Sequence, residues 1–211
     1  MKQKSTERFD QAAVNWDKKQ RRVQLAQNIA GAIGGLPLNR EMTAMDYGCG
    51  TGLVGLALAP KLKHLTGVDT SQGMLAVLAE KAAKLSENNV STRLLDLALA
   101  PSPEQFDLVI CSMALHHIEN VDKVLAEFFA ALNPDGYLAI ADLDEEDGSF
   151  HEQDAGEKHF GFERSRLGEK LADIGLKDIR FQTVHSIEKT VNGEQRSFPV
   201  FLATARKPQS H

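Results

Sequence analysis

The stretch MDYGCGTGLVG, residues 45–55, combines a carboxylate with closely spaced glycines in a pattern suited to holding a ligand against the backbone. An apolar run ends at Asp46, and glycines follow at alternate positions, Gly48, Gly50 and Gly52. Because glycine has no side chain, the chain can turn sharply there and a ligand can approach the main chain. The stretch therefore predicts a binding turn, with Asp46 favouring a positively charged ligand.

The spacing of these glycines separates two kinds of nucleotide-derived cofactor. A dinucleotide-binding turn has glycines in the pattern G-x-G-x-x-G, and counting from Gly48 and Gly50 the third glycine falls on Leu53. Asp46 in front of the turn would also repel a pyrophosphate. S-adenosylmethionine fits better, since it carries a sulfonium and an ammonium, has no phosphate, and offers ribose hydroxyls. Asp69, about 20 residues further on, can accept from such a ribose in either cofactor class.

The sequence around this turn alternates strand-like and helical patterns, which is typical of an α/β protein. We expect a doubly wound, Rossmann-like sheet with helices on both faces, in which the turn follows the first strand at the ligand-binding edge. The expected strands cover residues 42–47, 64–69, 90–97, 106–113, 136–144, 178–190 and 196–207, and the last two form a hairpin. The expected helices cover residues 5–35, 52–62, 71–85, 121–133 and 163–175.

The expected organisation is one globular unit with a small addition at its start. Residues 1–40 form a helical cap over the carboxyl edge of the sheet, and residues 41–211 form the cofactor-binding domain. Asp10 and Asp17 of the cap are expected to be solvated or paired with Lys or Arg. Residues 143–162 are acidic and lack periodicity, which predicts a long loop that could act as a lid.

Composition excludes several other classes of protein. The chain has 211 residues, 24 Lys and Arg against 29 Asp and Glu, and a net charge of −5, so nucleic acid is a poor partner. No stretch approaches the roughly 20 apolar residues of a membrane span, and no apolar segment stands at the start, which predicts a cytoplasmic protein. Cys49 and Cys111 lie in apolar settings and are expected to be buried thiols. The oligomeric state is not set by the sequence.

Five segments in order carry a family resemblance: MDYGCGTG, LTGVDTSQGML, RLLDL, FDLVICSMALHHI and LNPDGYLAIAD. Together they resemble the class I S-adenosylmethionine-dependent methyltransferases over roughly residues 43–142. FDQAAVNWD, residues 9–17, is similar to the N-terminal cap of the small-molecule methyltransferases of ubiquinone and menaquinone biosynthesis. The resemblance implies a seven-stranded, mostly parallel sheet with an antiparallel last strand, and transfer of a methyl group to a small molecule with S-adenosylhomocysteine as product.

The resemblance also implies roles for individual residues. Asp46 would steady the methionine end of the cofactor, Asp69 would bind the ribose, and Asp96 would accept from the adenine amine. Met74 would lie against the adenine, and the Cys111 carbonyl would meet the cofactor's ammonium. The full set of expected cofactor-binding residues is Trp16, Asp46, Gly48, Cys49, Gly50, Gly52, Asp69, Thr70, Met74, Asp96, Leu97 and Cys111.

Three of these positions also have a purely structural interpretation. Met74 lies on an apolar helical face and could belong to the core. Asp96 could cap the segment that follows it. Phe9 and Trp16 are seven residues apart, on one face of the predicted helix, and could pack as core or as a staple.

Catalysis needs little from the protein, because the sulfonium already makes the methyl group electrophilic. A weakly acidic acceptor would still benefit from a base within hydrogen-bonding reach. His116 is the first candidate for substrate contact or base, His117 the second, and His151 is expected in the lid. Alternatively, one histidine of the pair packs or caps the next helix while its neighbour faces solvent.

Residues 142–147 with His151 offer hard ligands, but without EF-hand or H-E-x-x-H spacing, so no metal is expected.

Two other functions remain open. A non-catalytic module that binds S-adenosylmethionine or a partner could have the same fold and site. An NAD(P)-dependent oxidoreductase of the short-chain type would have Tyr-x-x-x-Lys, but Tyr47 and Tyr137 are followed at that spacing by Thr51 and Ala141.

After the fourth strand the residues CSMA differ from the pattern of DNA amino-methyltransferases. The acidic loop favours a cationic or neutral acceptor, whose reacting atom could be oxygen, nitrogen or carbon.

Overall fold

The computed structural model describes residues 2–86, 88–150 and 157–209 and contains one seven-stranded sheet. The strands are β1 Thr43–Tyr47, β2 His64–Asp69, β3 Val90–Leu94, β4 Phe106–Ser112, β5 Leu132–Leu143, β6 Lys177–Val191 and β7 Glu194–Arg206. The α-helices are α1 Lys2–Ala12, α2 Gln20–Ile33, α3 Gly55–Leu58, α4 Gln72–Ala82, α5 Val121–Ala131 and α6 Arg164–Asp173. Short 3₁₀ helices are η1 Ala13–Lys18, η2 Ala59–Lys61 and η3 Leu115–His117.

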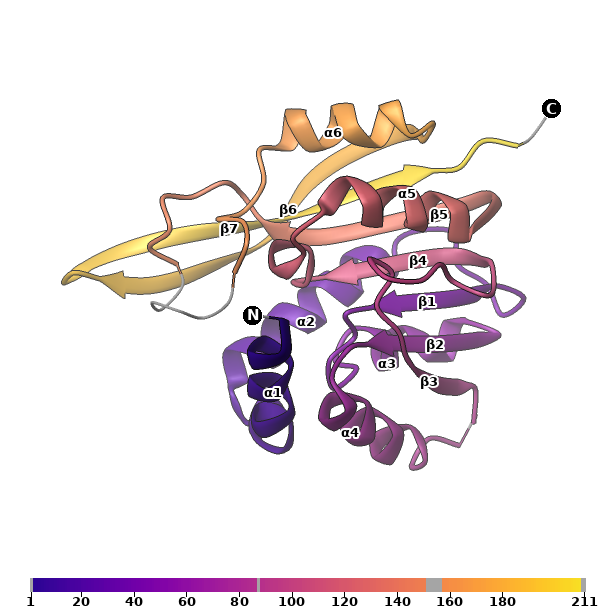
Figure 1. Cartoon of the computed structure of the whole chain (residues 1–211), viewed down its shortest axis with the longest axis horizontal. Helices are drawn as coiled ribbons and strands as arrows, with labels where there is room; N and C mark the ends of the chain where they lie inside the picture. The colour runs from indigo at the N-terminus through magenta and orange to yellow at the C-terminus, as the bar shows by residue number, and fades with distance from the viewer. Residues whose placement is uncertain (1, 87, 151–156, 210–211) are drawn as a thin grey trace.

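The sheet has the strand order β3-β2-β1-β4-β5-β7-β6 (Figure 1). Strands β1 to β5 pair in parallel, β7 runs antiparallel to β5, and β6 pairs antiparallel with β7. The predicted fold is confirmed, including the terminal hairpin and the antiparallel last strand. Because the strand order reverses between β1 and β4, a crevice is expected at the carboxyl ends of these two strands.

Helices cover both faces of the sheet, as the sequence predicted. Met45 of β1 packs in the core that α5 and α6 share, whereas Ala44 packs in the core with α2 and α3. Helix α4 lies on the second of these faces, against β2 and β3. Strand β4 is buried on both faces, which accounts for its continuous apolar run. Among the described residues, no helix combines the length and apolar character that crossing a bilayer requires.

The N-terminal segment differs from its prediction. A single helix over residues 5–35 was expected, but α1 begins at Lys2, η1 follows it, and the chain is extended at Lys19 (φ −82°, ψ 101°) before α2 begins. This break redirects the chain, so that α1 reaches α4 while α2 packs on the sheet. Figure 1 shows α1 and the start of α2 facing the arrowheads of β1 and β2.

Asp10 fastens the N-terminal segment to the start of α4. Its Oδ1 accepts hydrogen bonds from the Ser71 hydroxyl at 2.6 Å and from the Gly73 amide at 2.8 Å. The expectation that Asp10 is solvated or paired with Lys or Arg was therefore wrong. The carboxylate lies where the helix dipole and unpaired amides favour negative charge, and these hydrogen bonds lower the pKa of Asp10.

Asp17 makes the corresponding contact with the turn after β1. Its carboxylate accepts from the Thr51 hydroxyl at 2.5 Å and from Lys81 Nζ at 2.7 Å. Lys81 Nζ also donates to the Thr51 carbonyl at 2.8 Å. The expected pairing of Asp17 with a basic residue is confirmed. Through Asp10 and Asp17 the cap is attached to both turns that follow the first two strands.

Two smaller predictions need correction. The helix predicted over residues 52–62 is reduced to the four residues of α3 followed by η2, because Pro60 has no amide hydrogen with which to continue an α-helix. The strand predicted over residues 136–144 begins earlier, at Leu132, and includes Asp135, which has a positive φ of 65°, near a shift in the register with β4.

The acidic segment after β5 is held by the C-terminal hairpin. Asp144 pairs with Arg164 at 2.6 Å, and Asp147 pairs with Arg196 of β7 at 2.9 Å. Lys189 Nζ of β6 donates to the Phe150 carbonyl. The carboxylates of Asp144 and Asp147 are therefore engaged by arginines within the chain. Whether residues 143–162 move as a lid stays a prediction.

Replacing Gly48 by alanine should destabilise the protein more than replacing Gly193. Both glycines have a positive φ, of 68° and 86°, so alanine costs roughly 1–2 kcal/mol at either position. An added Cβ at Gly48 would lie 2.4 Å from the Ala114 Cβ, whereas at Gly193 it would meet nothing within 4 Å. The clash should add about 1–3 kcal/mol. Chemical denaturation measures both losses, and equal losses would contradict the predicted clash.

Candidate functional site

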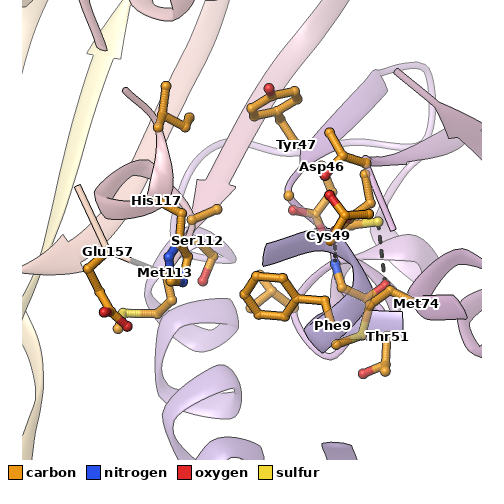
Figure 2. A pocket seen from close by; sticks show the side chains of 18 of the residues that line it. Phe9, Asp46, Tyr47, Cys49, Thr51, Met74, Ser112, Met113, His117 and Glu157 are labelled. Carbon is orange, nitrogen blue, oxygen red and sulfur yellow. Dashed lines mark hydrogen bonds between the residues drawn. The ribbon is translucent and has the colours of Figure 1, made fainter. Parts of the chain in front are cut away.

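A cavity of about 1220 Å³ lies at the carboxyl ends of the parallel strands, beneath the N-terminal segment (Figure 2). This volume slightly exceeds the roughly 300–1,000 Å³ of common small-molecule sites, so it can hold a cofactor and an acceptor together. Ten of the fifteen predicted site residues line it: Trp16, Asp46, Gly48, Cys49, Gly50, Asp69, Thr70, Met74, Asp96 and His117. The edge of the sheet thus brings together residues from four strand ends and the cap.

Asp46 is a buried carboxylate at the end of β1, with a relative exposure of 2%. Its pKa is raised to about 7, first by burial and then by the negative charge of Asp69, while a hydrogen bond from the Gly55 amide acts in the opposite direction. A bound cation would restore the favourable surroundings of the ionised carboxylate. Asp46 is therefore suited to a positively charged ligand group.

Asp69, at the end of β2, connects the two turns of the site. Its Oδ2 accepts from the Gly50 amide at 2.8 Å, and its Oδ1 accepts from the Ser71 amide at 2.9 Å. Burial raises the pKa of Asp69, while hydrogen bonds from the Ser71, Gly50 and Thr70 amides oppose the rise. The same carboxylate that was expected to take a ribose hydroxyl also fixes the glycine turn in place.

Asp96 and Met74 have the structural roles that the sequence left open, and both also line the cavity. Asp96 lines the cavity, and its Oδ1 also accepts from the Ala98 amide at 2.9 Å, as a cap does. Met74 is 2% exposed in a core position, and it still contributes to the cavity wall. Their contacts with an adenine ring stay predictions.

Three predicted cofactor residues lie behind the cavity wall. Leu97 and Cys111 are fully buried in the core, and the cavity is lined instead by the neighbouring Ala98 and Ser112. Gly52 also lies off the wall. The side chains of Leu97 and Cys111 pack in the core, and the contact predicted for the Cys111 carbonyl stays a prediction. The predicted His151 lies outside the described residues.

Gly52 has a packing role behind the turn. Its φ is 79°, and a Cβ there would lie 2.4 Å from Leu78 Cδ1 of α4. This glycine therefore lets α4 approach the binding turn closely.

The structure corrects the predicted order of the two histidines. His116 has an exposure of 3%, does not line the cavity, and its Nδ1 lies 2.7 Å from Asp142 Oδ1. Burial opposes protonation of His116, but the charge and hydrogen bond of Asp142, aided by Glu157, outweigh it and raise its pKa. His116 is thus a packing residue, as the alternative had it, and His117 lines the cavity.

An aromatic group forms the wall between the cap and the end of β4. The Phe9 ring lies 5.3 Å from the His117 ring and 5.7 Å from the Trp16 ring, both in edge-to-face arrangements. Figure 2 shows Phe9 between His117 and the Cys49 side of the site. Met113, also on the wall, has a positive φ of 52°, a strained conformation that often marks functional sites. The sequence indicated neither Phe9 nor Met113 as a cavity residue.

Within the described part of the chain, no group of three or more His, Cys, Asp or Glu side chains could hold a metal ion. The acidic residues considered as hard ligands are instead engaged with other partners: Asp142 with His116, Asp144 with Arg164, and Asp147 with Arg196.

Known proteins place the fold and the site in one class. Residues 38–189 match the family described as a methyltransferase domain, which is more than half of the chain. The chain belongs to this family. The N-methyltransferase NodS from Bradyrhizobium japonicum WM9, solved with S-adenosyl-L-homocysteine, superimposes with a TM-score of 0.69 at 17% identity and covers 98% of both chains. The shared fold agrees with the family expected from the sequence.

Curated relatives match a shorter region. An uncharacterized methyltransferase from Schizosaccharomyces pombe is 36% identical over 118 residues, 52% of this chain and 42% of that protein. A ubiquinone biosynthesis O-methyltransferase from Coxiella burnetii is 29% identical over 100 residues, 47% of this chain and 42% of that protein. The matches thus span less than half the length of these relatives.

Binding of S-adenosylmethionine, the cofactor predicted from the sequence, should weaken as the pH falls below about 7, where Asp46 takes up a proton. A bound cation favours the ionised form of Asp46. Below the pKa of Asp46 the carboxyl group must therefore lose its proton when the cofactor binds, and the affinity for S-adenosylmethionine should fall by up to about tenfold per pH unit. Calorimetric titration across this range tests the expectation. The Asp46→Asn variant should bind S-adenosylmethionine weakly even at high pH, and its affinity should no longer depend on pH. A wild-type affinity that does not change with pH would contradict the prediction.

Proposed function

We propose that this protein transfers a methyl group from S-adenosylmethionine to a small-molecule acceptor. The observation that carries the proposal is the pair of carboxylates on either side of the glycine turn, Asp46 buried and Asp69 partly buried. Two neighbouring anions withdrawn from water are costly without a cation, and S-adenosylmethionine supplies a sulfonium and an ammonium. The methyltransferase family and the product-bound structural relative support the same cofactor.

The transfer itself is an in-line displacement. A lone pair of the acceptor forms a bond to the methyl carbon, while the carbon–sulfur bond breaks and its electrons stay on sulfur. The cofactor becomes the neutral thioether S-adenosylhomocysteine, and the acceptor releases its proton, where it has one, to a base or to water. The main task of the protein is to hold acceptor, methyl group and sulfur in line.

His117 is the proposed base or acceptor contact. It lines the cavity next to Phe9, and the adjacent His116 is fixed from behind by Asp142. The rings of the two histidines lie with centroids 4.2 Å apart. Because Asp142 binds the backbone amide and the ring of His116, it holds the short helix η3 in place. In the proposed arrangement, η3 directs His117 toward the acceptor.

The N-terminal segment and the acidic loop complete the proposed organisation. Residues 1–40 act as a cap and residues 41–211 as the cofactor-binding domain, supported by the contacts of Asp10 and Asp17 with the two turns. Within residues 143–162, the described positions Gly148, Glu157, Lys158 and Phe160 line the cavity, which supports a covering role. A small molecule as acceptor, in place of nucleic acid, is supported by the net charge of −5. The cytoplasmic location stays a prediction.

A labelled-methyl assay tests the proposed function. The protein is incubated with methyl-labelled S-adenosylmethionine and a panel of small metabolites with oxygen, nitrogen and carbon acceptors, and transfer of label is expected to at least one class. Calorimetry in parallel measures binding of S-adenosylmethionine and NAD(H). Cofactor binding without transfer to any acceptor would favour the non-catalytic alternative, and tight NAD(H) binding without S-adenosylmethionine binding would overturn the proposal.

His117→Ala should lower kcat by about 100-fold on a weakly acidic acceptor while the cofactor affinity is unchanged, since a positioned base contributes about 10²–10⁴-fold. His64→Ala is the matched control, because His64 begins β2 at the opposite end of the sheet and contacts Ser91. Steady-state kinetics over a range of pH measure both variants. Wild-type turnover in His117→Ala would remove this residue from the mechanism.

A further inference from the structure

We propose that the acceptor carries an oxyanion, a carboxylate or a phosphate, which Arg22 binds together with Arg8 on the cap side of the cavity. This inference rests on the proposed function and specifies its substrate class. Both arginines line the cavity, and both belong to the N-terminal segment, Arg8 to α1 and Arg22 to α2.

Arg22 is held in a geometry suited to binding an anion. Its guanidinium carbon lies 3.5 Å from the centre of the Trp16 ring, and Nη1 donates to the Trp16 carbonyl at 3.3 Å. Stacking fixes the plane of the guanidinium and leaves its edge available for a paired contact with two oxygens. On the same face of α2, Leu25, Ala26 and Ile29 continue the cavity wall and offer apolar surface to the rest of an acceptor.

The cavity is polarised by the origin of its charged residues. Asp46, Asp69 and Asp96 come from the ends of strands and mark the proposed cofactor side, whereas Arg8 and Arg22 come from the cap. Figure 1 shows α1 and the start of α2 opposite the ends of β1 and β2. A cationic cofactor on the sheet side and an anionic acceptor on the cap side would each meet charge of the opposite sign.

Arg22 also has an electrostatic cost that a bound anion would offset. Burial lowers its pKa, and the positive charges of Arg21 and Arg8 lower it further, while Asp17 acts in the opposite direction. Asp17 directs its oxygens to Thr51 and Lys81. An anion bound by Arg22 would offset part of this cost.

Charged residues of both signs also line the wall outside the strand ends and the cap: Glu119, Lys123, Glu157 and Lys158. Lys123 Nζ donates to the Ala98 carbonyl at 2.6 Å, and Glu157 raises the pKa of His116. The acidic loop led us to expect a cationic or neutral acceptor. Its carboxylates Asp144 and Asp147 pair with arginines and do not line the cavity, whereas Glu157 of the same loop does, so the inference rests on the arginines of the cap and not on the loop.

Calorimetry on the full chain saturated with S-adenosylhomocysteine tests the proposal. The probes are benzoate and phenyl phosphate, with benzamide and phenol as their uncharged counterparts. We expect the anions to bind at least about tenfold more tightly than the uncharged compounds, as a charge-assisted paired hydrogen bond allows. The preference between benzoate and phenyl phosphate then distinguishes a carboxylate from a phosphate.

Variants link this preference to the two arginines. Arg22→Gln and Arg8→Gln should each abolish the preference for the anion, and Arg22→Lys should keep part of it because the charge remains while the planar fork is lost. Arg21→Gln is the matched control, since Arg21 neighbours Arg22 on α2 but is exposed and lies off the cavity wall. This control should keep the wild-type preference and the wild-type affinity for S-adenosylhomocysteine.

The result that would overturn the inference is equal binding of charged and uncharged probes, no detectable anion binding at millimolar concentration, or an unchanged preference in Arg22→Gln. Affinity for S-adenosylhomocysteine is measured first in every variant. Normal cofactor binding without anion preference overturns this inference alone. Failure of the wild-type protein to bind S-adenosylhomocysteine would overturn the proposed function, and the inference with it.

Discussion

Two carboxylates lie at the ends of neighbouring parallel strands, Asp46 buried and Asp69 partly buried, and this is the constraint on which the rest of the site depends. Asp46 and Asp69 raise each other's energy in the empty protein, and the fold offsets part of that cost with amide hydrogens from Gly50, Gly55 and Ser71. These amides can point at the carboxylates only because the chain turns sharply after each strand. The glycine pattern, the closeness of α4 and the charge of the bound cofactor all follow from this arrangement.

The cap depends on the same turns. Asp17 contacts the turn after β1 through Thr51, and Asp10 contacts the turn after β2 through Ser71. The cap is therefore positioned by polar contacts with the cofactor-binding backbone as well as by the apolar packing of α2. Any shift of the two turns would be transmitted to α1, and with it to Phe9 and Arg8 on the acceptor side of the cavity.

Local pattern was enough to predict the sheet and the half of the site formed by strand ends. Asp46, Gly48, Gly50 and Asp69 are fixed by short segments whose period and turn chemistry specify their place. The other half depends on contacts between distant segments. Whether His116 or His117 faces the cavity is decided by Asp142, 26 residues away, and the positions of the cap residues depend on the break at Lys19, which helical periodicity did not reveal.

The C-terminal hairpin has a consequence for the order in which the protein is made. Strands β6 and β7 have 15 and 13 residues, against 5 to 7 in β1 to β4, and β7 lies between β5 and β6 in the sheet. Arg196 and Lys189 hold the acidic loop from this hairpin. During synthesis the glycine turn and both carboxylates leave the ribosome early, but the loop gains its last anchor, Arg196, only when β7 has emerged. The cofactor side can therefore form while the chain is still growing, and the acceptor side is completed last.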